Sequence, residues 1–296
     1  MIAIEYLFLS LSVVSGSAKS AFSKLLSPYS KTSAHFGFTN TVLSLTAAMI
    51  LYLLNGGNVD TDHTKSILLG ILFGICTTAA QYFYMRAMAH GAVSVVTFIY
   101  SCGFLLPTFA GTLFWSEPLK LPVIGGCLLL LFAFFLCGRK TDSVGAKKQR
   151  SSGCIGYPLI AMICSGLLGV LQKVHQTSAE RAETGTFLVI AFLVSALLSA
   201  VIALCGKTHQ TDEKLPLARV SLLSCICGAF VGTANQVNLI LSGALPAATV
   251  FPITNGGVVV LSALVGHVVF RERLSSSALS GILLGIVSII IIGLNK

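Results

Sequence analysis

Residues 120–138 read KLPVIGGCLLLLFAFFLCG, and this run decides the class of fold. Its one charged residue, Lys120, stands at the start, and almost every later side chain is apolar. A helix needs about 20 mainly apolar residues to cross the hydrocarbon core of a bilayer. The run is therefore predicted to form a transmembrane helix.

Nine similar runs lie on both sides of it, so the chain is predicted to be an all-α integral membrane protein with ten spans. The other predicted spans are 4–26, 35–54, 66–88, 92–115, 154–175, 185–205, 217–241, 246–270 and 275–294. The composition agrees, because only 10% of the residues are charged, whereas a soluble domain has about 25%. These runs leave no room for a soluble domain.

The basic side chains that give the chain its net charge of +9 stand mostly in the gaps between the apolar runs. Lys and Arg in such gaps anchor helices at the membrane surface. We therefore expect the lipid bilayer as a partner and do not expect nucleic acid. Paired carboxylates, a cluster of metal ligands and a Ser-His-Asp arrangement are all missing at membrane depth in the predicted spans. The sequence accordingly predicts no enzyme, no cofactor and no metal.

The residues around the first run recur later in the chain. Glu117 and Glu272 stand 155 positions apart, and the same shift pairs Thr78 with Thr233. The pairing continues without a gap as far as Gly138. Glu117 and Glu272 are thus the markers of an internal duplication. Each starts or precedes a predicted helix, where a carboxylate complements exposed backbone N–H groups, so we interpret both as structural caps or gate hinges.

The duplication predicts two repeats of five helices each. Residues 1–138 form the first repeat, residues 139–153 a basic connecting loop, and residues 154–296 the second repeat. Because the number of helices in a repeat is odd, the second repeat enters the membrane from the opposite side. Many secondary transporters have this inverted-repeat plan, with the substrate site between the repeats near the middle of the membrane.

Two corresponding stretches, WSEPLKLPVIGG at 115–126 and FRERLSSSALSG at 270–281, each join a Glu-x-Leu turn to a Gly. Together with the five-helix halves, they resemble the EamA-type domains of the drug/metabolite transporter superfamily. The resemblance covers nearly the whole chain. It implies a transporter of small metabolites, often an exporter of amino acids or related solutes across the bacterial inner membrane. We expect such a transporter to work by alternating access.

Small multidrug members of the superfamily carry a membrane-embedded Glu in the first helix, two turns before a Lys. In this chain Lys24 is present, but Gly16 stands where the Glu would be. Export of a small polar metabolite is therefore our main interpretation. Efflux of lipophilic cations and a membrane partner protein that does not transport are the alternatives. The sequence leaves open whether the chain forms a homodimer.

No Asp or Glu lies in the middle of a predicted span, and Lys19 is the exception among the charged residues. Ser12, Ser15, Lys19 and Ser23 are spaced so that they share one face of the first predicted helix. Two interpretations of this stripe remain open. Either it lines a wet cavity, where Lys19 meets an anionic group such as a carboxylate, or Lys19 extends to the lipid headgroups.

Polar side chains in other predicted spans complete the candidate substrate site. The predicted substrate-binding residues are Lys19, Gln81, Tyr84, Tyr100, Gln172, Asn235, Asn238 and Asn255. Amides in hydrocarbon need partners, so these groups either line a cavity or bond helices together. Lys173 and His175, near the end of the sixth predicted span, are expected at the membrane interface instead.

Helix breakers mark the fourth and ninth predicted spans, at Pro107 and at Pro252, which is followed by Gly256 and Gly257. Pro removes a backbone hydrogen bond and Gly weakens the turn around it. These segments are predicted either to unwind, to offer backbone groups to a substrate and to act in gating, or simply to kink and pack closely.

The distribution of Lys and Arg predicts the orientation in the membrane. With residues 139–153 in the cytoplasm, most basic residues fall on the cytoplasmic side, as the positive-inside rule requires. Both termini then lie outside the cell (inner) membrane. The family resemblance more often implies cytoplasmic termini, and where the two disagree we follow the charges.

Overall fold

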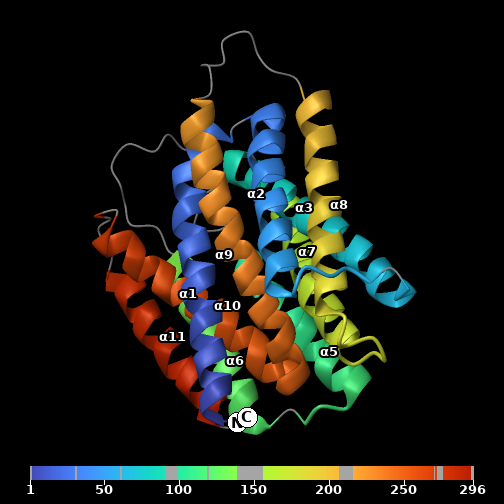
Figure 1. Cartoon of the computed structure of the whole chain (residues 1–296). Coiled ribbons are helices and arrows are strands. Elements are labelled where there is room, and N and C mark those ends of the chain that lie inside the picture. The colour runs from blue at the N-terminus through green and yellow to red at the C-terminus, as the bar shows by residue number, and fades with distance from the viewer. Residues whose placement is uncertain are drawn as a thin grey trace. The chain divides into compact units, whose positions relative to one another are not determined.

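The computed structural model describes residues 2–30, 32–60, 62–90, 96, 99–118, 120–138, 156–206, 216–269, 271 and 276–294 (Figure 1). Over these residues the chain is mainly helical, and the described part contains no strand. The predicted all-α fold class is therefore confirmed. The predicted connecting loop at 139–153 and the repeat marker Glu272 lie outside the described residues.

The described helices follow the predicted spans closely. They are α1 (Ile2–Leu26), α2 (Ser33–Leu54), α3 (Thr64–His90), α5 (Leu105–Trp115), α6 (Leu121–Gly138), α7 (Gly156–Gln176), α8 (Thr184–Cys205), α9 (Leu217–Ala244), α10 (Ala247–Val268) and α11 (Ser276–Leu294). The structure also has two 3-10 turns. The turn η1 (Ser27–Tyr29) follows α1, and the turn η2 (Cys102–Phe104) precedes α5. Nine predicted spans differ from their helix by at most three residues at either end, and the fourth is described only in part.

The ends of α2 show how local sequence sets these bounds. The Thr32 hydroxyl accepts a hydrogen bond from the backbone N–H of His35 at 3.3 Å and so caps the start of the helix. After Leu54 the chain passes through Gly56 and Gly57, whose φ angles are +77° and +75°. Only glycine adopts this left-handed backbone at little cost, so the pair ends the helix.

Seven of the described helices, α2, α3, α7, α8, α9, α10 and α11, are long and apolar enough to cross a membrane. Ile99–Trp115 and Leu121–Leu136 form shorter apolar helices, and α1, which carries Glu5, Lys19 and Lys24, is not among the seven. Large apolar side chains such as Leu121 and Leu204 are more than four-fifths exposed. Such a surface is compatible with lipid and not with water. The chain is an α-helical, multi-pass membrane protein.

The described helices group into two compact units, and each unit takes segments from both halves of the sequence. Unit 1 consists of Met1–Thr78 and Leu171–Gly243, and unit 2 of Ala79–Val170 and Ala244–Lys296. The boundaries fall inside α3 and α7. The predicted repeats, 1–138 and 154–296, divide the chain in a different way and stay a prediction.

In unit 1, α2 and α8 lie side by side with their backbones close together (Figure 1). A Cβ atom on Gly37 would collide with the backbone of Ala203, so a larger residue does not fit there. Hydrogen bonds join the same two helices, from the Asn40 amide to the Ser199 hydroxyl at 2.7 Å and between the Ser44 and Ser195 hydroxyls at 3.1 Å. Small residues and short polar bonds of this kind hold helices together where the surroundings are apolar.

In unit 2, α6 packs against α11 by the same means. The Ser288 hydroxyl donates to the backbone carbonyl of Gly126 at 2.6 Å. A Cβ atom on Gly126 would lie 2.5 Å from the side chain of Ile292. On α10, a Cβ atom on Gly256 would come within 2.8 Å of the Leu130 side chain on α6. The glycines of this unit therefore allow close contact between helices.

Candidate functional site

Helix α9 joins α1 and α7 of unit 1 through polar side chains. The Ser12 hydroxyl on α1 donates to the side-chain oxygen of Asn238 on α9 at 2.5 Å. The Gln172 amide on α7 donates to the side-chain oxygen of Asn235 at 3.3 Å. Four of the predicted substrate-binding residues, Lys19 among them, thus lie on three adjoining helices of one unit.

Lys19 is half-buried in α1, at a place where that helix faces α9. Around it, the Phe22 ring stacks on Phe230 at 5.8 Å, and the Cys227 thiol donates to the backbone carbonyl of Lys19 at 3.8 Å. Within the described part of the chain, the ammonium group of Lys19 makes no hydrogen bond and no ion pair. The last residue of α1, Leu26, is seven positions further along the chain, a distance of about 10 Å along the axis. The structure therefore presents one partly buried cation without a counter-ion among these residues.

Lys173 and His175, predicted to lie at the membrane interface, are buried side chains in the last turn of α7. Lys173 is 6% exposed, and its ammonium group donates to the carbonyl of Ser242 at 2.9 Å, in the last turn of α9. His175 is fully buried, with its ring stacked 4.5 Å from Phe187 and its Nε2 atom 3.1 Å from the Ser66 hydroxyl. The free carbonyls at the end of α9 attract a cation inwards, and spacing along α7 alone could not reveal this contact. The position of both residues at the membrane interface stays a prediction.

Asn55 and Gln236 form a pair of amides that the sequence analysis did not predict. Each donates to the side-chain oxygen of the other at 3.2 Å, and Thr184 donates to Asn55 at 2.9 Å. Asn55 directly follows α2, at the capping position before Gly56 and Gly57. Gln236 is the repeat partner of Gln81, and its side chain holds three segments of unit 1 together.

The other four predicted substrate-binding residues belong to unit 2. The rings of Tyr84 and Tyr100 lie 4.7 Å apart, so α3 and the fourth predicted span bring these two residues together. Gln81 is half-buried on α3, three residues before Tyr84. Asn255 is half-buried on α10, and its amide donates to the carbonyl of Phe251 on the same helix at 2.9 Å. Their role in binding a substrate stays a prediction.

The two predicted helix breaks differ in the structure. The 3-10 turn η2 comes directly before α5, and Pro107 lies in the first turn of α5, where a missing backbone N–H costs little. By contrast, α10 is helical throughout, with Pro252 and the buried Gly256 and Gly257 inside it. No unwound segment is found there, and the close contact of Gly256 with Leu130 agrees with the packing interpretation.

Glu117 caps a helix, but not the one that follows it. Its Oε2 atom accepts a hydrogen bond from the backbone N–H of Ala247, the first residue of α10, at 2.7 Å. The turn before it passes through Ser116 with a φ of +51°, which directs the chain away from α5. The residue capping α10 therefore comes from far earlier in the chain, which spacing alone could not predict.

We expect Glu117→Ala to lower the stability of the protein by about 0.5–2 kcal/mol, because the start of α10 loses its carboxylate partner. Glu117→Gln keeps a side-chain oxygen that can accept the bond and should lose less. Thermal unfolding of the purified protein in detergent measures both changes. Equal melting temperatures for Glu117→Ala and the unchanged protein would contradict the cap.

The apolar helices define the class of the protein, which is a polytopic α-helical membrane protein. A family model described as the EamA-like transporter family matches residues 152–294. The second half of the chain is thus an EamA-like domain of the drug/metabolite transporter superfamily, whose members are transporters and not enzymes.

A solved crystal structure has the same fold over nearly the whole length of the chain. The TM-score is 0.74 at 16% sequence identity, and the comparison covers 98% of this chain and 96% of the other. Identity this low establishes similarity of fold alone. A comparison with curated proteins found no significant match.

Proposed function

We propose that the chain is an alternating-access transporter with ten spans in two inverted five-helix repeats, and that it exports a small polar metabolite such as an amino acid. The family match supports transport. Seven helices of spanning length, two shorter apolar helices and α1 account for the ten predicted spans. The ungapped repeat from Thr78 to Gly138 supports the inversion.

The observation that carries the proposal is the partly buried ammonium group of Lys19, which lacks a partner among the described residues. A carboxylate on the substrate would complete this group with a charge-assisted hydrogen bond. The amides of Gln172, Asn235 and Asn238 on the adjoining helices offer neutral donors and acceptors to the rest of a polar solute. Together these groups suit an anionic or zwitterionic substrate of small size.

Efflux of lipophilic cations is the second candidate, and the charges of the described helices disfavour it. Glu5, in the first turn of α1, is the one Asp or Glu within those helices. A buried carboxylate would favour a cation inside a membrane, whereas Lys19 would repel a cationic solute. A membrane partner that does not transport is the third candidate, and uptake measurements separate it from the other two.

The decisive experiment uses the full chain reconstituted in liposomes. Uptake of labelled amino acids is compared with uptake of a labelled lipophilic cation, and liposomes without protein provide the background. Saturable uptake of at least one amino acid above background supports the proposal. Uptake of the cation alone would favour multidrug efflux, and no uptake of any solute would favour a partner protein.

We propose that residues 139–153 face the cytoplasm and that both termini lie outside the cell membrane. A phosphatase that is active only outside, fused after Lys296, should therefore be active, while a fluorescent protein that matures only inside should stay dark there. The same two reporters inserted in the 139–153 loop provide the control and should give the opposite result. Fluorescence at the C-terminus would reverse the orientation.

A further inference from the structure

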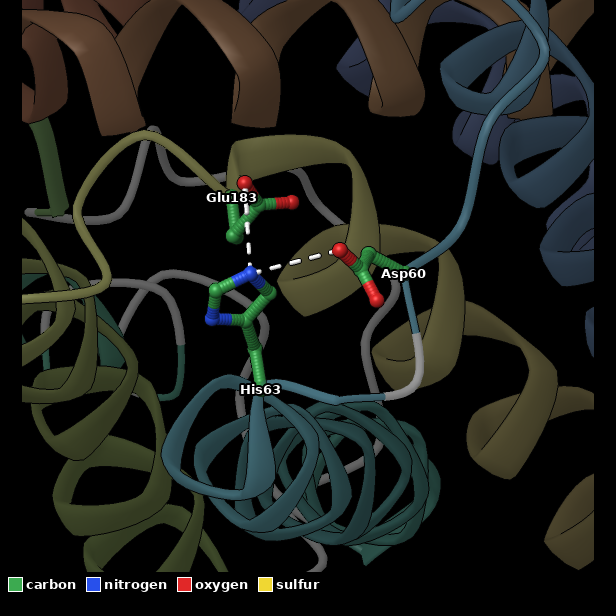
Figure 2. Close-up of side chains that lie close together, drawn as sticks. All are labelled: Asp60, His63 and Glu183. Carbon is green, nitrogen blue, oxygen red and sulfur yellow. Dashed lines mark ion pairs between the residues drawn. The ribbon is translucent and has the colours of Figure 1, made fainter.

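Two loops of unit 1 hold four of the ten acidic residues of the chain. Asp60 and Asp62 lie between α2 and α3, and Glu180 and Glu183 lie between α7 and α8. His63 stands among them and is half-buried. Figure 2 shows its ring between the carboxylates of Asp60 and Glu183, which come from the two different loops.

The distances between these three side chains are too long for direct hydrogen bonds and leave room for a shared metal ion. The His63 Nε2 atom lies 3.4 Å from Asp60 Oδ2 and 3.7 Å from Glu183 Oε1. Hydrogen bonds of the N–H···O kind are about 2.7–3.2 Å long. Ligand atoms bound tetrahedrally to one Zn²⁺ at about 2.0–2.1 Å are roughly 3.3–3.4 Å apart. All three candidate ligand atoms lie within 4.8 Å of one another.

The backbone around the cluster holds the two carboxylates toward His63. Asp60 Oδ1 accepts a hydrogen bond from the N–H of Asp62 at 3.0 Å, which leaves Oδ2 for the cluster. The N–H of Asp60 donates to the hydroxyl of Thr186 on α8, also at 3.0 Å. Glu183 occupies the capping position of α8, yet its side chain makes no capping hydrogen bond and turns to His63 instead. Outer contacts of this kind orient metal ligands.

A hydrogen bond to Glu180 joins the loop between α7 and α8 to the start of α3, beside the cluster. Its Oε2 atom accepts a hydrogen bond from the backbone N–H of Ser66, in the first turn of α3, at 2.7 Å. Desolvation opposes the charge, but hydrogen bonds from Ser66 and the backbone of Lys65, together with His63, lower the pKa of Glu180 below its usual value. The loops that carry Asp60, His63 and Glu183 are thus positioned by a separate contact.

We propose that Asp60, His63 and Glu183 bind one divalent transition-metal ion, with Zn²⁺ as the ion that fits them best. An imidazole nitrogen with two carboxylate oxygens suits Zn²⁺, whereas Ca²⁺ and Mg²⁺ prefer oxygen alone. Asp60 is exposed, so the ion can enter from water, and water completes the coordination. The bound ion ties the loop between α2 and α3 to the loop between α7 and α8. The site lies in loops outside the spans, although the sequence predicted no metal. The metal site does not depend on the proposed function.

The test uses the full chain in detergent, freed of metal with a chelator and then titrated with Zn²⁺ or Co²⁺. Zn²⁺ should bind saturably, with one ion per chain, and raise the melting temperature. Co²⁺ should give the visible absorption of a tetrahedral site without a thiolate-to-cobalt band. His63→Gln and Glu183→Gln should each weaken Zn²⁺ binding by at least about 10–100-fold.

Asp62→Asn is the matched control, because it removes a charge from the same loop but touches no proposed ligand atom; its Zn²⁺ affinity should be unchanged. Melting temperatures measured without metal show whether each variant folds. If one of the variants does not fold, Asp60→Asn is tested in its place. Unchanged binding in both His63→Gln and Glu183→Gln would overturn the proposal. So would a thiolate-to-cobalt band, which would place the ion on cysteine, or the lack of saturable binding.

Discussion

Lys19→Ala is expected to abolish transport while the protein still inserts in the membrane. The variant removes the half-buried ammonium group that has no counter-ion among the described residues. If that group binds a substrate carboxylate, its loss costs about 1.5–3 kcal/mol, or roughly a factor of 10 to 150 in affinity. Uptake of labelled amino acids at matched expression measures the loss.

Two further variants separate the charge of Lys19 from the size of the site. Lys19→Arg keeps the charge but carries a larger planar group, so it should restore transport only in part. Asn255→Leu removes a polar group from α10 and should impair transport without changing the charge. Near-normal transport in Lys19→Ala, with Asn255→Leu impaired, would mean that the lysine extends to the headgroups. Near-normal transport in both would mean that the site lies on other faces.

Gly37→Val is expected to prevent stable folding of unit 1. The added Cβ atom would collide with the backbone of Ala203 and the carbonyl of Ser199, neither of which can move as a side chain can. Helices α2 and α8 would have to separate, and the Asn40–Ser199 bond would lengthen. Overpacking costs about 1–3 kcal/mol and each interhelical bond about 0.6, so we expect a loss of about 2–4 kcal/mol.

Gly125→Val is the matched control for Gly37→Val. Gly125 is also in a helix, but a Cβ atom built there meets nothing within 4 Å. The control should melt near the temperature of the unchanged protein, while Gly37→Val should melt far lower or aggregate. Size-exclusion chromatography after heating steps measures both. Similar profiles for the two variants would show that α2 and α8 tolerate a wider spacing.

Most of the fold could be predicted from the sequence because the hydrophobic signal is local and long. Runs such as 185–205 contain almost no polar residue, and the helix there begins and ends within one residue of the prediction. The EamA family could also be predicted, since the Glu-x-Leu stretches and the two five-helix halves resemble that family. Both signals are read along the chain and require no knowledge of contacts.

The details of the candidate site could not be predicted because they depend on partners distant in sequence. Lys173 donates to the carbonyl of Ser242, which lies 69 positions further along the chain, so spacing along α7 could not reveal this contact. Asp60 and Glu183 are separated in the chain by α3, α5, α6 and α7, so nothing in the sequence placed them near the same imidazole. A search confined to membrane depth also passed over loops, where these residues lie.

The interleaving of the two compact units has a consequence for biosynthesis. Unit 1 needs Leu171–Gly243, and unit 2 needs Ala244–Lys296, so neither is complete when the ribosome has made only the first half. Until α8 is inserted, the glycine face of α2 around Gly37 has lipid or an insertion factor as its neighbour instead of Ala203. A nascent chain halted after residue 138 would hold two unfinished cores. Quality control during insertion must therefore tolerate a half-assembled intermediate.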